Sequence, residues 1–494
     1  MTLVREMIKD MEDLRGDNTF GFPLLKLYKV PAIMALVGMW TEDGVPSRNE
    51  TDPHFSKQRF LTWAQIKEMT SSGLIEIASH SYDLHHGVLG NPQGNTQPAA
   101  VTLQYHSALN QYETLEQRRV RISADLEKNS RTIERHLGKR PRTMVWPYGA
   151  YDRIGIEAAA RAGMSINFTL DAGRAAVGNT EIVPRILVDK EMPLSTFSYL
   201  VQYAFTQRNN DPVHALKVHL DRLYDKSSEQ ENKNLGTLIE RVRTLGLNTV
   251  VLQPFVTPGP SGLIEEVYFP NSILPMRSDL LNRVAWQLKS RLGVMVYILV
   301  PVSGLALPEN GTLRPLELTA EQDRQHLFKF YEELRSHIPI HGIIFTGVQS
   351  SAAEADIQQN LPKQIRSYRY FPDEGSGSDM PSINLHAKYG WNFKTADQSH
   401  PFAVVDVPQN LRSGYVKEFT QKLPVNYVTL LSLPVADLDA KRLQLLIQRI
   451  RMLQANGMNH FVLDDDAFLD DPAQVNALRS VLSLKSNPYL EVGQ

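Results

Sequence analysis

From Phe22 to about Phe205 the chain alternates short apolar runs with longer amphipathic ones. Short, continuous apolar runs are typical of buried strands, and apolar positions at helical spacing predict helices. Helical spacing of apolar positions is found at residues 61–73 and 112–137, which predicts two helices. The first of them should end at Gly73. Alternating strands and helices predict a mostly parallel sheet flanked by helices. The strands are expected within residues 30–38, 74–80, 143–149 and 166–173.

The polar, turn-rich sequence QRNNDP at residues 207–212 is interpreted as a linker, after which the alternation restarts. Helix-like runs separate the strand candidates that follow it. Seven such candidates over residues 212–485 predict a (β/α)₈-like barrel in which one strand is hard to recognise. They are residues 217–221, 248–255, 294–302, 342–347, 402–407, 427–433 and 460–465.

Composition narrows the classes of partner and of site. A net charge of −2 gives no bulk attraction to nucleic acid, so none is expected as a partner, whereas a neutral polymer or a small molecule is compatible. The chain has no cysteine, which excludes disulfides, thiolate metal sites and a cysteine nucleophile. The charged N-terminal sequence has no apolar segment typical of a signal peptide, and no apolar run reaches the roughly 18 residues of a membrane span.

The sequence IASHSYDLHHG places three histidines directly after a predicted strand. In parallel α/β sheets, ligands bind at the carboxyl ends of strands. His80 and His85 could therefore bind zinc or a similar divalent metal and leave positions for a carboxylate and a water. Solvated histidines on a polar loop are the alternative, and the residues alone leave both open.

The same segment resembles the second motif of the polysaccharide deacetylases (carbohydrate esterase family 4), in the spacing of the poly-β-1,6-N-acetylglucosamine N-deacetylases of biofilm matrix export. FPLLKLYKVPAIMALVG, GNPQGNTQPA, VWPYGAYD, NFTLDAG and VPRILV follow the order of that group. KVHLDRLYD, VVLQPF and VYFPNSILPMRSDLLNRVAWQL extend the resemblance through the second half. It implies a deacetylase domain over residues 1–206, a distorted and N-terminally incomplete β/α barrel, followed by a glycoside-hydrolase-like barrel over residues 212–485.

The resemblance implies a role for several residues of the first domain. His80 and His85 would be ligands of a divalent metal, which could be zinc, nickel, cobalt or iron, and His86 would be solvated or would support a ligand. Trp146 and Tyr148, from the third motif, would wall the sugar groove; a packed turn is the alternative. Asp171, from the fourth motif, would orient catalytic groups; the alternative is an ordinary aspartate at a strand end.

The first motif, of the form TFDDG in the family, is not intact. Its position falls at DMED, residues 10–13, without a preceding apolar strand. Asp13 is the candidate for the third metal ligand and Glu12 for a catalytic carboxylate; the alternative is a charged N-terminal helix. The family's general acid histidine lies upstream of this motif, and this sequence starts too late to contain it. Weak deacetylation is therefore expected of the chain as it stands.

The barrel also departs from the family pattern. Relatives have a catalytic aspartate in a Phe-His-Asp-Asp strand end, where this chain has Thr346, Gly347 and Val348. Leu299 stands where relatives often have an aromatic residue. Since glycoside hydrolysis normally needs carboxyl groups beside the bond, the barrel is expected to bind sugars without cleaving them. Groove candidates are His219, Asp221, Gln253 and the YFPN turn, Tyr268 to Asn271. Asp464, Asp465 and Asp466 either face the groove or form a helix cap and a solvated loop.

The leading hypothesis is metal-dependent N-deacetylation of poly-β-1,6-N-acetylglucosamine during biofilm matrix export. The resemblance further implies that the protein lies in the periplasm or on the periplasmic face of the outer membrane. It also implies an outer-membrane export porin as a partner. The alternative is a catalytically impaired protein that binds the polysaccharide or assists its export. Deacetylation of a different acetylated sugar is a third option, against which the GNPQGN segment argues.

Overall fold

The chain forms two compact units, residues 1–211 and 212–494, each considered by itself. The computed structural model describes residues 7–9, 21–42, 60–170, 180–186, 188, 193–195, 197–198, 212–346 except 302, 310, 311 and 339, 366–371, 402–407, 428–434, 439–464 and 471–483. Across these ranges, no helix combines the length and the apolar character needed to cross a membrane.

The described strands of the first unit form a six-stranded sheet in the order β1-β2-β3-β8-β9-β10, with every neighbouring pair parallel. The predicted parallel α/β organisation is confirmed. Burial of their apolar side chains explains why β2 is a continuous apolar run and why β3 is apolar apart from Glu76 and Ser79. The strands are β1 (Met7–Lys9), β2 (Ala32–Leu36), β3 (Ile75–Ser79), β8 (Thr143–Val145), β9 (Ile166–Thr169) and β10 (Val183–Pro184).

Strand β1 corrects one expectation. No strand was expected before DMED, yet β1 pairs in parallel with β2, with Met7 opposite Ala32 and Lys9 opposite Met34. Three residues that include a lysine are too short and too polar for a recognisable apolar run. Glu12 and Asp13 themselves lie outside the described residues.

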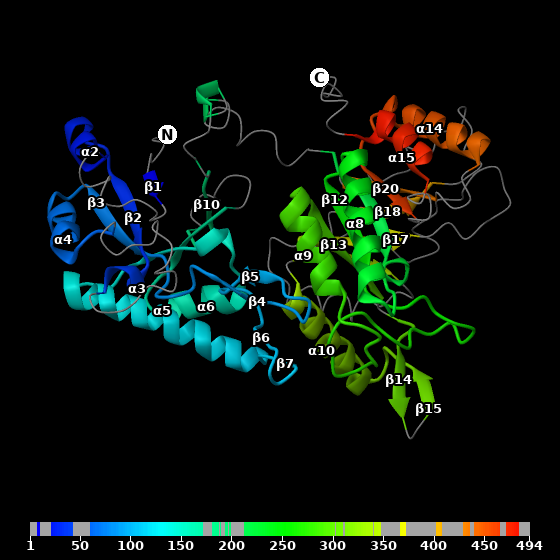
Figure 1. Cartoon of the computed structure of the whole chain (residues 1–494), viewed down its shortest axis with the longest axis horizontal. Coiled ribbons are helices and arrows are strands. Elements are labelled where there is room, and N and C mark those ends of the chain that lie inside the picture. The colour runs from blue at the N-terminus through cyan, green and yellow to red at the C-terminus, as the bar shows by residue number, and fades with distance from the viewer. Residues whose placement is uncertain are drawn as a thin grey trace. The chain divides into compact units, whose positions relative to one another are not determined.

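Two helices of the first unit begin at complete capping boxes. Thr62 pairs with Gln65 at the start of α4, and Thr114 pairs with Gln117 at the start of α5. The cap at Thr114 explains why α5 starts three residues later than predicted, and a left-handed Gly138 ends it. Figure 1 shows α6 lying along α5. The helices are α2 (Phe22–Tyr28), α3 (Gly38–Thr41), α4 (Trp63–Ser71), α5 (Leu115–Leu137), the 3₁₀ turn η4 (Pro147–Gly149) and α6 (Arg153–Arg161).

Residues 87–113 between β3 and α5, here called the hairpin segment, form two short antiparallel pairs that the periodicity did not predict. Their two- and three-residue strands are too short to show an alternating pattern. The segment contains the GNPQGNTQPA sequence. Its strands are β4 (Gly87–Leu89), β5 (Thr96–Pro98), β6 (Tyr105–His106) and β7 (Gln111–Tyr112).

In the described part of the second unit, eight strands close into a barrel in which every neighbouring pair is parallel, as predicted. The strand that the sequence did not reveal is β17, whose RSYRYF sequence alternates polar and aromatic residues instead of forming an apolar run. The barrel strands are β11 (His214–His219), β12 (Thr249–Gln253), β13 (Met295–Pro301), β16 (Gly342–Thr346), β17 (Arg366–Phe371), β18 (Phe402–Asp406), β19 (Val428–Pro434) and β20 (Phe461–Asp464).

Helices α8, α9 and α10 lie outside the barrel strands (Figure 1). Their buried faces and the strands form one apolar core that spans the unit. The remaining described elements of this unit are η5 (Leu220–Arg222), α8 (Ser228–Leu245), α9 (Leu281–Leu292), the hairpin β14 (Ala306–Glu309) with β15 (Thr312–Pro315), α10 (Glu321–His337), α14 (Ala440–Gln454) and α15 (Pro472–Leu482).

Candidate metal centre

His80 and His85 converge beyond the carboxyl end of β3. Their ring centroids are 4.9 Å apart and the ring planes are inclined by 44°. Two imidazoles bound to one zinc at ordinary Zn–N distances, with a ligand angle of about 90–110°, would place their ring centres about 4.5–5.2 Å apart. The observed separation is within that range, so the two rings fit a shared metal ion.

The hydrogen bonding of His80 also suits a metal ligand. Its side chain is fully buried, and Nδ1 lies 2.6 Å from the carbonyl oxygen of Val145 on β8. A carbonyl only accepts, so Nδ1 carries the proton and Nε2 carries the lone pair. Metal-binding histidines usually donate their second ring N–H to such a carbonyl or carboxylate, which fixes the tautomer and the ring orientation.

Two aromatic side chains flank His85. Tyr148 stacks on its ring with centroids 4.6 Å apart, and Trp40 approaches edge-on at 5.2 Å. Tyr148 is 50% exposed and has a left-handed backbone conformation, with φ at 56°. Such a conformation costs a non-glycine residue about 1–3 kcal/mol and is often found at functional sites. Tyr148 therefore orients the His85 ring and presents an open aromatic surface beside it.

Each backbone N–H from His80 to Leu84 has a protein acceptor, so the segment joining the two histidines is fixed through its backbone. Asp125 on α5 accepts two of these bonds, from Tyr82 to one carboxylate oxygen and from Asp83 to the other, both at 2.8 Å. Burial raises the pKa of the Asp125 carboxyl to about 7, while the two amide bonds act in the opposite direction. The other acceptors are Leu36 O for His80, Ser79 Oγ for Ser81 and Ser81 Oγ for Leu84.

The Tyr82 side chain is held from three sides. Its hydroxyl donates to Glu42 at 2.6 Å, which together with burial raises its pKa, and Lys128 Nζ lies 3.6 Å from the ring centroid. The ring also packs against Gly38, where a Cβ would lie only 2.6 Å from Tyr82 Cδ2 and 2.4 Å from Asn129 Oδ1. Gly38 is therefore required by the close approach of α3 to the histidine segment.

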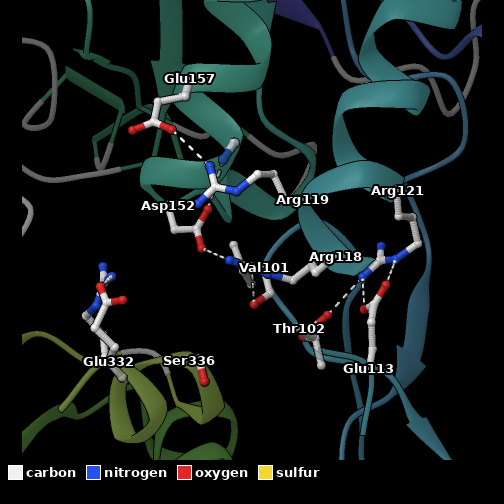
Figure 2. Close-up of polar contacts among 12 residues, drawn as sticks. Val101, Thr102, Glu113, Arg118, Arg119, Arg121, Asp152, Glu157, Glu332 and Ser336 are labelled. Atoms are coloured by element: carbon white, nitrogen blue, oxygen red, sulfur yellow. Dashed lines mark hydrogen bonds and ion pairs between the residues drawn. The ribbon is translucent and has the colours of Figure 1, made fainter. Parts of the chain in front are cut away.

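Arginines near the start of α5 anchor the hairpin segment (Figure 2). Arg118, which is almost fully buried, donates to the carbonyl of Val101 at 2.7 Å and pairs with Asp152. Arg121 donates to the carbonyls of Ala99 and Thr102 and forms an ion pair with Glu113. One helix thus fixes both the segment between the histidines and the segment that follows them.

The other predicted residues of this site lie in different surroundings. Trp146 is fully buried, and its indole N–H donates to Asn167 at 3.0 Å, so its ring lies in the core and offers no surface to a sugar. His86 is partly exposed, with Nδ1 3.6 Å from Asp83 Oδ1. Asp171, like Glu12 and Asp13, lies outside the described residues. Within the described ranges, no group of three or more His, Cys, Asp or Glu side chains is arranged to hold a metal ion.

The groove candidates of the barrel come together at the carboxyl ends of its strands. His219 and Gln253 end neighbouring strands and are partners in the register. Asp221 accepts hydrogen bonds from the Tyr268 hydroxyl at 2.6 Å and from the amide and hydroxyl of Thr257. Tyr268 is fully buried, so a sugar could meet its ring only after neighbouring side chains move. Asn271 caps the following turn by accepting from the amides of residues 273 and 274.

The remaining barrel residues lie on three other strands. Thr346 is the last residue of β16, and Leu299 is buried on β13. Asp464 ends β20 and forms an ion pair with Lys217 of the neighbouring strand β11. Gly347, Val348, Asp465 and Asp466 lie outside the described residues.

Sequence reasoning missed Trp40, Asp125 and the supporting residues of α5. Asp125 stands at helical spacing from Lys128, Asn129 and Thr132, which marks one face of α5. That spacing gives no sign of what the face contacts, because the histidine segment lies more than 40 residues earlier in the chain.

Comparison with known proteins gives a consistent result. The sequence model of the polysaccharide deacetylase family matches residues 18–167, and that of hypothetical glycosyl hydrolase family 13 matches residues 217–326. The poly-β-1,6-N-acetyl-D-glucosamine N-deacetylase of Escherichia coli K12 is 31% identical over 393 residues, which cover 76% of this chain and 58% of the relative. This chain thus spans less than two thirds of that relative's length.

Two solved structures from Bordetella bronchiseptica are also similar. The deacetylase domain of BpsB is 40% identical, with a TM-score of 0.34, over 37% of this chain and 69% of that one. The PgaB (BpsB) glycoside hydrolase domain is 25% identical, with a TM-score of 0.46, over 56% of this chain and all of that one.

Proposed function

Because this chain belongs to the poly-β-1,6-N-acetyl-D-glucosamine N-deacetylase family, we propose that its first unit removes N-acetyl groups from that polymer with a divalent metal bound at His80 and His85. The observation that carries the proposal is that the two imidazole rings lie beyond a strand end with their centroids 4.9 Å apart, while His80 Nδ1 donates to the carbonyl of Val145. That arrangement supports Nε2 of His80 as a ligand atom.

Amide hydrolysis needs a nucleophilic water and a stabilised oxyanion, and a bound divalent metal supplies both chemistries. The chain's own residues hold the rings and position the sugar. His80 is fixed by β8 and His85 by Trp40 and Tyr148, while the exposed ring of Tyr148 offers an apolar face for a pyranose ring. Asp13 is the proposed third ligand, Glu12 a proposed catalytic carboxylate and Asp171 a proposed orienting residue, all on sequence grounds.

The barrel is proposed to bind the partly deacetylated polymer without cleaving it. Asp221 accepts three hydrogen bonds, and a carboxylate has about four lone-pair sites, so it can still attract a glucosamine ammonium. His219 and Gln253 at adjacent strand ends would contribute polar contacts. Binding should weaken with added salt, because charge attraction in an open groove is screened.

From the same family membership we propose that the protein lies in the periplasm or on the periplasmic face of the outer membrane. We also propose an export porin as its partner. Both agree with a polymer that is modified during export.

The test is release of free amine from N-acetylglucosamine oligomers linked β-1,6, with and without added zinc, nickel, cobalt or iron. We expect release that requires metal and falls at least 100-fold in His80→Ala and in His85→Ala, because loss of even an outer-shell partner typically costs about 10–100-fold. His106→Ala is the matched control, since His106 is exposed on β6 and should be neutral. Equal rates in all variants would contradict the proposal. Polymer binding without amine release would favour the accessory role instead.

A further inference from the structure

Helix α5 presents one polar face to the segment that joins the two histidines. Asp125 and Lys128 contact Tyr82 and Asp83 of that segment, and Asn129 contacts Ser79, the residue before His80. Of these contacts, only those of Asp125 reach the backbone between the histidines directly. The proposed metal ligands therefore depend for their spacing on a residue about 40 positions later in the chain.

The backbone between the histidines needs such support because it has no regular structure. Ser81 has a left-handed conformation, with φ at 71°, which is unfavourable for a residue with a side chain. This turn directs the N–H groups of Tyr82 and Asp83 to α5, while the carbonyls of Ser81 and Tyr82 accept from the amides of Gly38 and Met39. The segment is thus held between α3 on one side and Asp125 on the other.

A carboxylate suits this position better than any other side chain. Each oxygen accepts one amide at 2.8 Å, so both donors are satisfied by one rigid planar group. Asparagine has the same size, but its NH₂ group would face one of the two N–H donors and could not accept from it. In its ionised form the carboxylate also makes both hydrogen bonds stronger than a neutral acceptor would.

We infer that Asp125 is a positioning residue for the metal site, which sets the separation of His80 and His85 through the amides of Tyr82 and Asp83. This inference rests on the proposed function, because it assumes that the two histidines bind a metal. Asp125 is not a ligand in this account and acts only through the backbone of the segment.

The experiment measures the zinc dissociation constant of the full chain by competition with a chromogenic chelator, alongside its melting temperature. Asp125→Asn should bind zinc about 10–100-fold more weakly, which is the usual cost of losing an outer-shell partner. The Co²⁺-loaded variant should also show a changed visible absorption spectrum, because the ligand geometry is no longer fixed. A change in overall stability alone would leave that spectrum unaltered.

Ser130→Ala is the matched control. Ser130 is buried on the same helix and donates to the carbonyl of Ala162 at 2.8 Å, away from the histidine segment. It should lower the melting temperature and leave both zinc affinity and the Co²⁺ spectrum unchanged. If Asp125→Asn did not fold, Asp125→Glu would replace it, because it keeps both acceptor oxygens but moves them by one methylene, and the same weakening is expected.

His80→Ala distinguishes failure of the inference about Asp125 from failure of the proposed metal site. Zinc affinity lost in His80→Ala but retained in the Asp125 variant would overturn the inference and leave the proposed metal site intact. Zinc affinity unchanged in His80→Ala would overturn the proposed site itself. An equal loss of affinity in the Asp125 and Ser130 variants would also overturn the inference, because the effect would then follow general stability.

Discussion

Gly38→Ala should damage the histidine segment by steric crowding alone. An added Cβ would lie 2.4 Å from Asn129 Oδ1 and 2.6 Å from Tyr82 Cδ2, about 1 Å closer than ordinary van der Waals contact. Neither neighbour can move freely. Asn129 donates to Leu36 O and Ser79 Oγ, and the Tyr82 hydroxyl donates to Glu42. Overpacking of this kind costs about 1–3 kcal/mol, and the displaced Tyr82 should also weaken zinc binding.

Gly236→Ala is the matched control, since Gly236 lies inside α8 and a Cβ there would meet nothing within 4 Å. It should stabilise the barrel by about 0.5–1 kcal/mol, because alanine loses less conformational entropy in a helix than glycine. Hydrogen exchange in increasing urea, read on peptides from each unit, measures both effects separately. If Gly38→Ala left the first unit as stable as before and its zinc affinity unchanged, the packing account of the site would be refuted.

Two further predictions concern stability. Burial lowers the pKa of His337 to about 4 from its usual 6.5, so the unfolded chain binds a proton more readily. The barrel should keep its full stability above about pH 6.5 and lose about 3 kcal/mol through this residue as the pH falls to 4. Urea unfolding at several pH values measures this loss, and a His337→Gln variant with the same pH dependence would contradict the prediction. Arg118→Ala should cost the first unit about 1–3 kcal/mol, because it removes the buried partner of Asp152 and leaves the carbonyl of Val101 without its donor. Arg119→Ala, which removes the more exposed pair with Glu157, should cost less than about 1 kcal/mol, and equal effects in hydrogen exchange would be inconsistent with the structure.

Hydrophobic periodicity predicted both sheets because their strands are buried and apolar. β2, β3, β12 and β13 are mainly apolar segments, and the positions of His80, His219 and Gln253 at strand ends followed from the predicted strands. β1, β10 and β17 were not predicted, because β1 and β10 have only three and two residues and β17 mixes polar with aromatic residues. Sequence pattern thus located the strand ends but not every strand.

The supporting residues of the site could not be predicted in the same way. Asp125 and Gly38 act through contacts with Tyr82 across more than 40 residues of chain, and such contacts depend on how α3 and α5 pack against the sheet. Trp146 shows the opposite case, in which a residue predicted to belong to the site lies in the core. Its aromatic character suggested a sugar-binding surface, but a hydrogen bond to Asn167 and close packing on Gly155 keep it in the core.

The central claim, that His80 and His85 together hold one divalent metal, is tested most directly by X-ray absorption at the zinc edge on the chain loaded with one equivalent of zinc. The account predicts scattering from two imidazole rings with Zn–N distances of about 2.0–2.1 Å, the other ligands being oxygen. His80→Ala should remove one ring from that spectrum, while His106→Ala should leave both. A spectrum with one imidazole or none, or one that His80→Ala does not change, would contradict the claim.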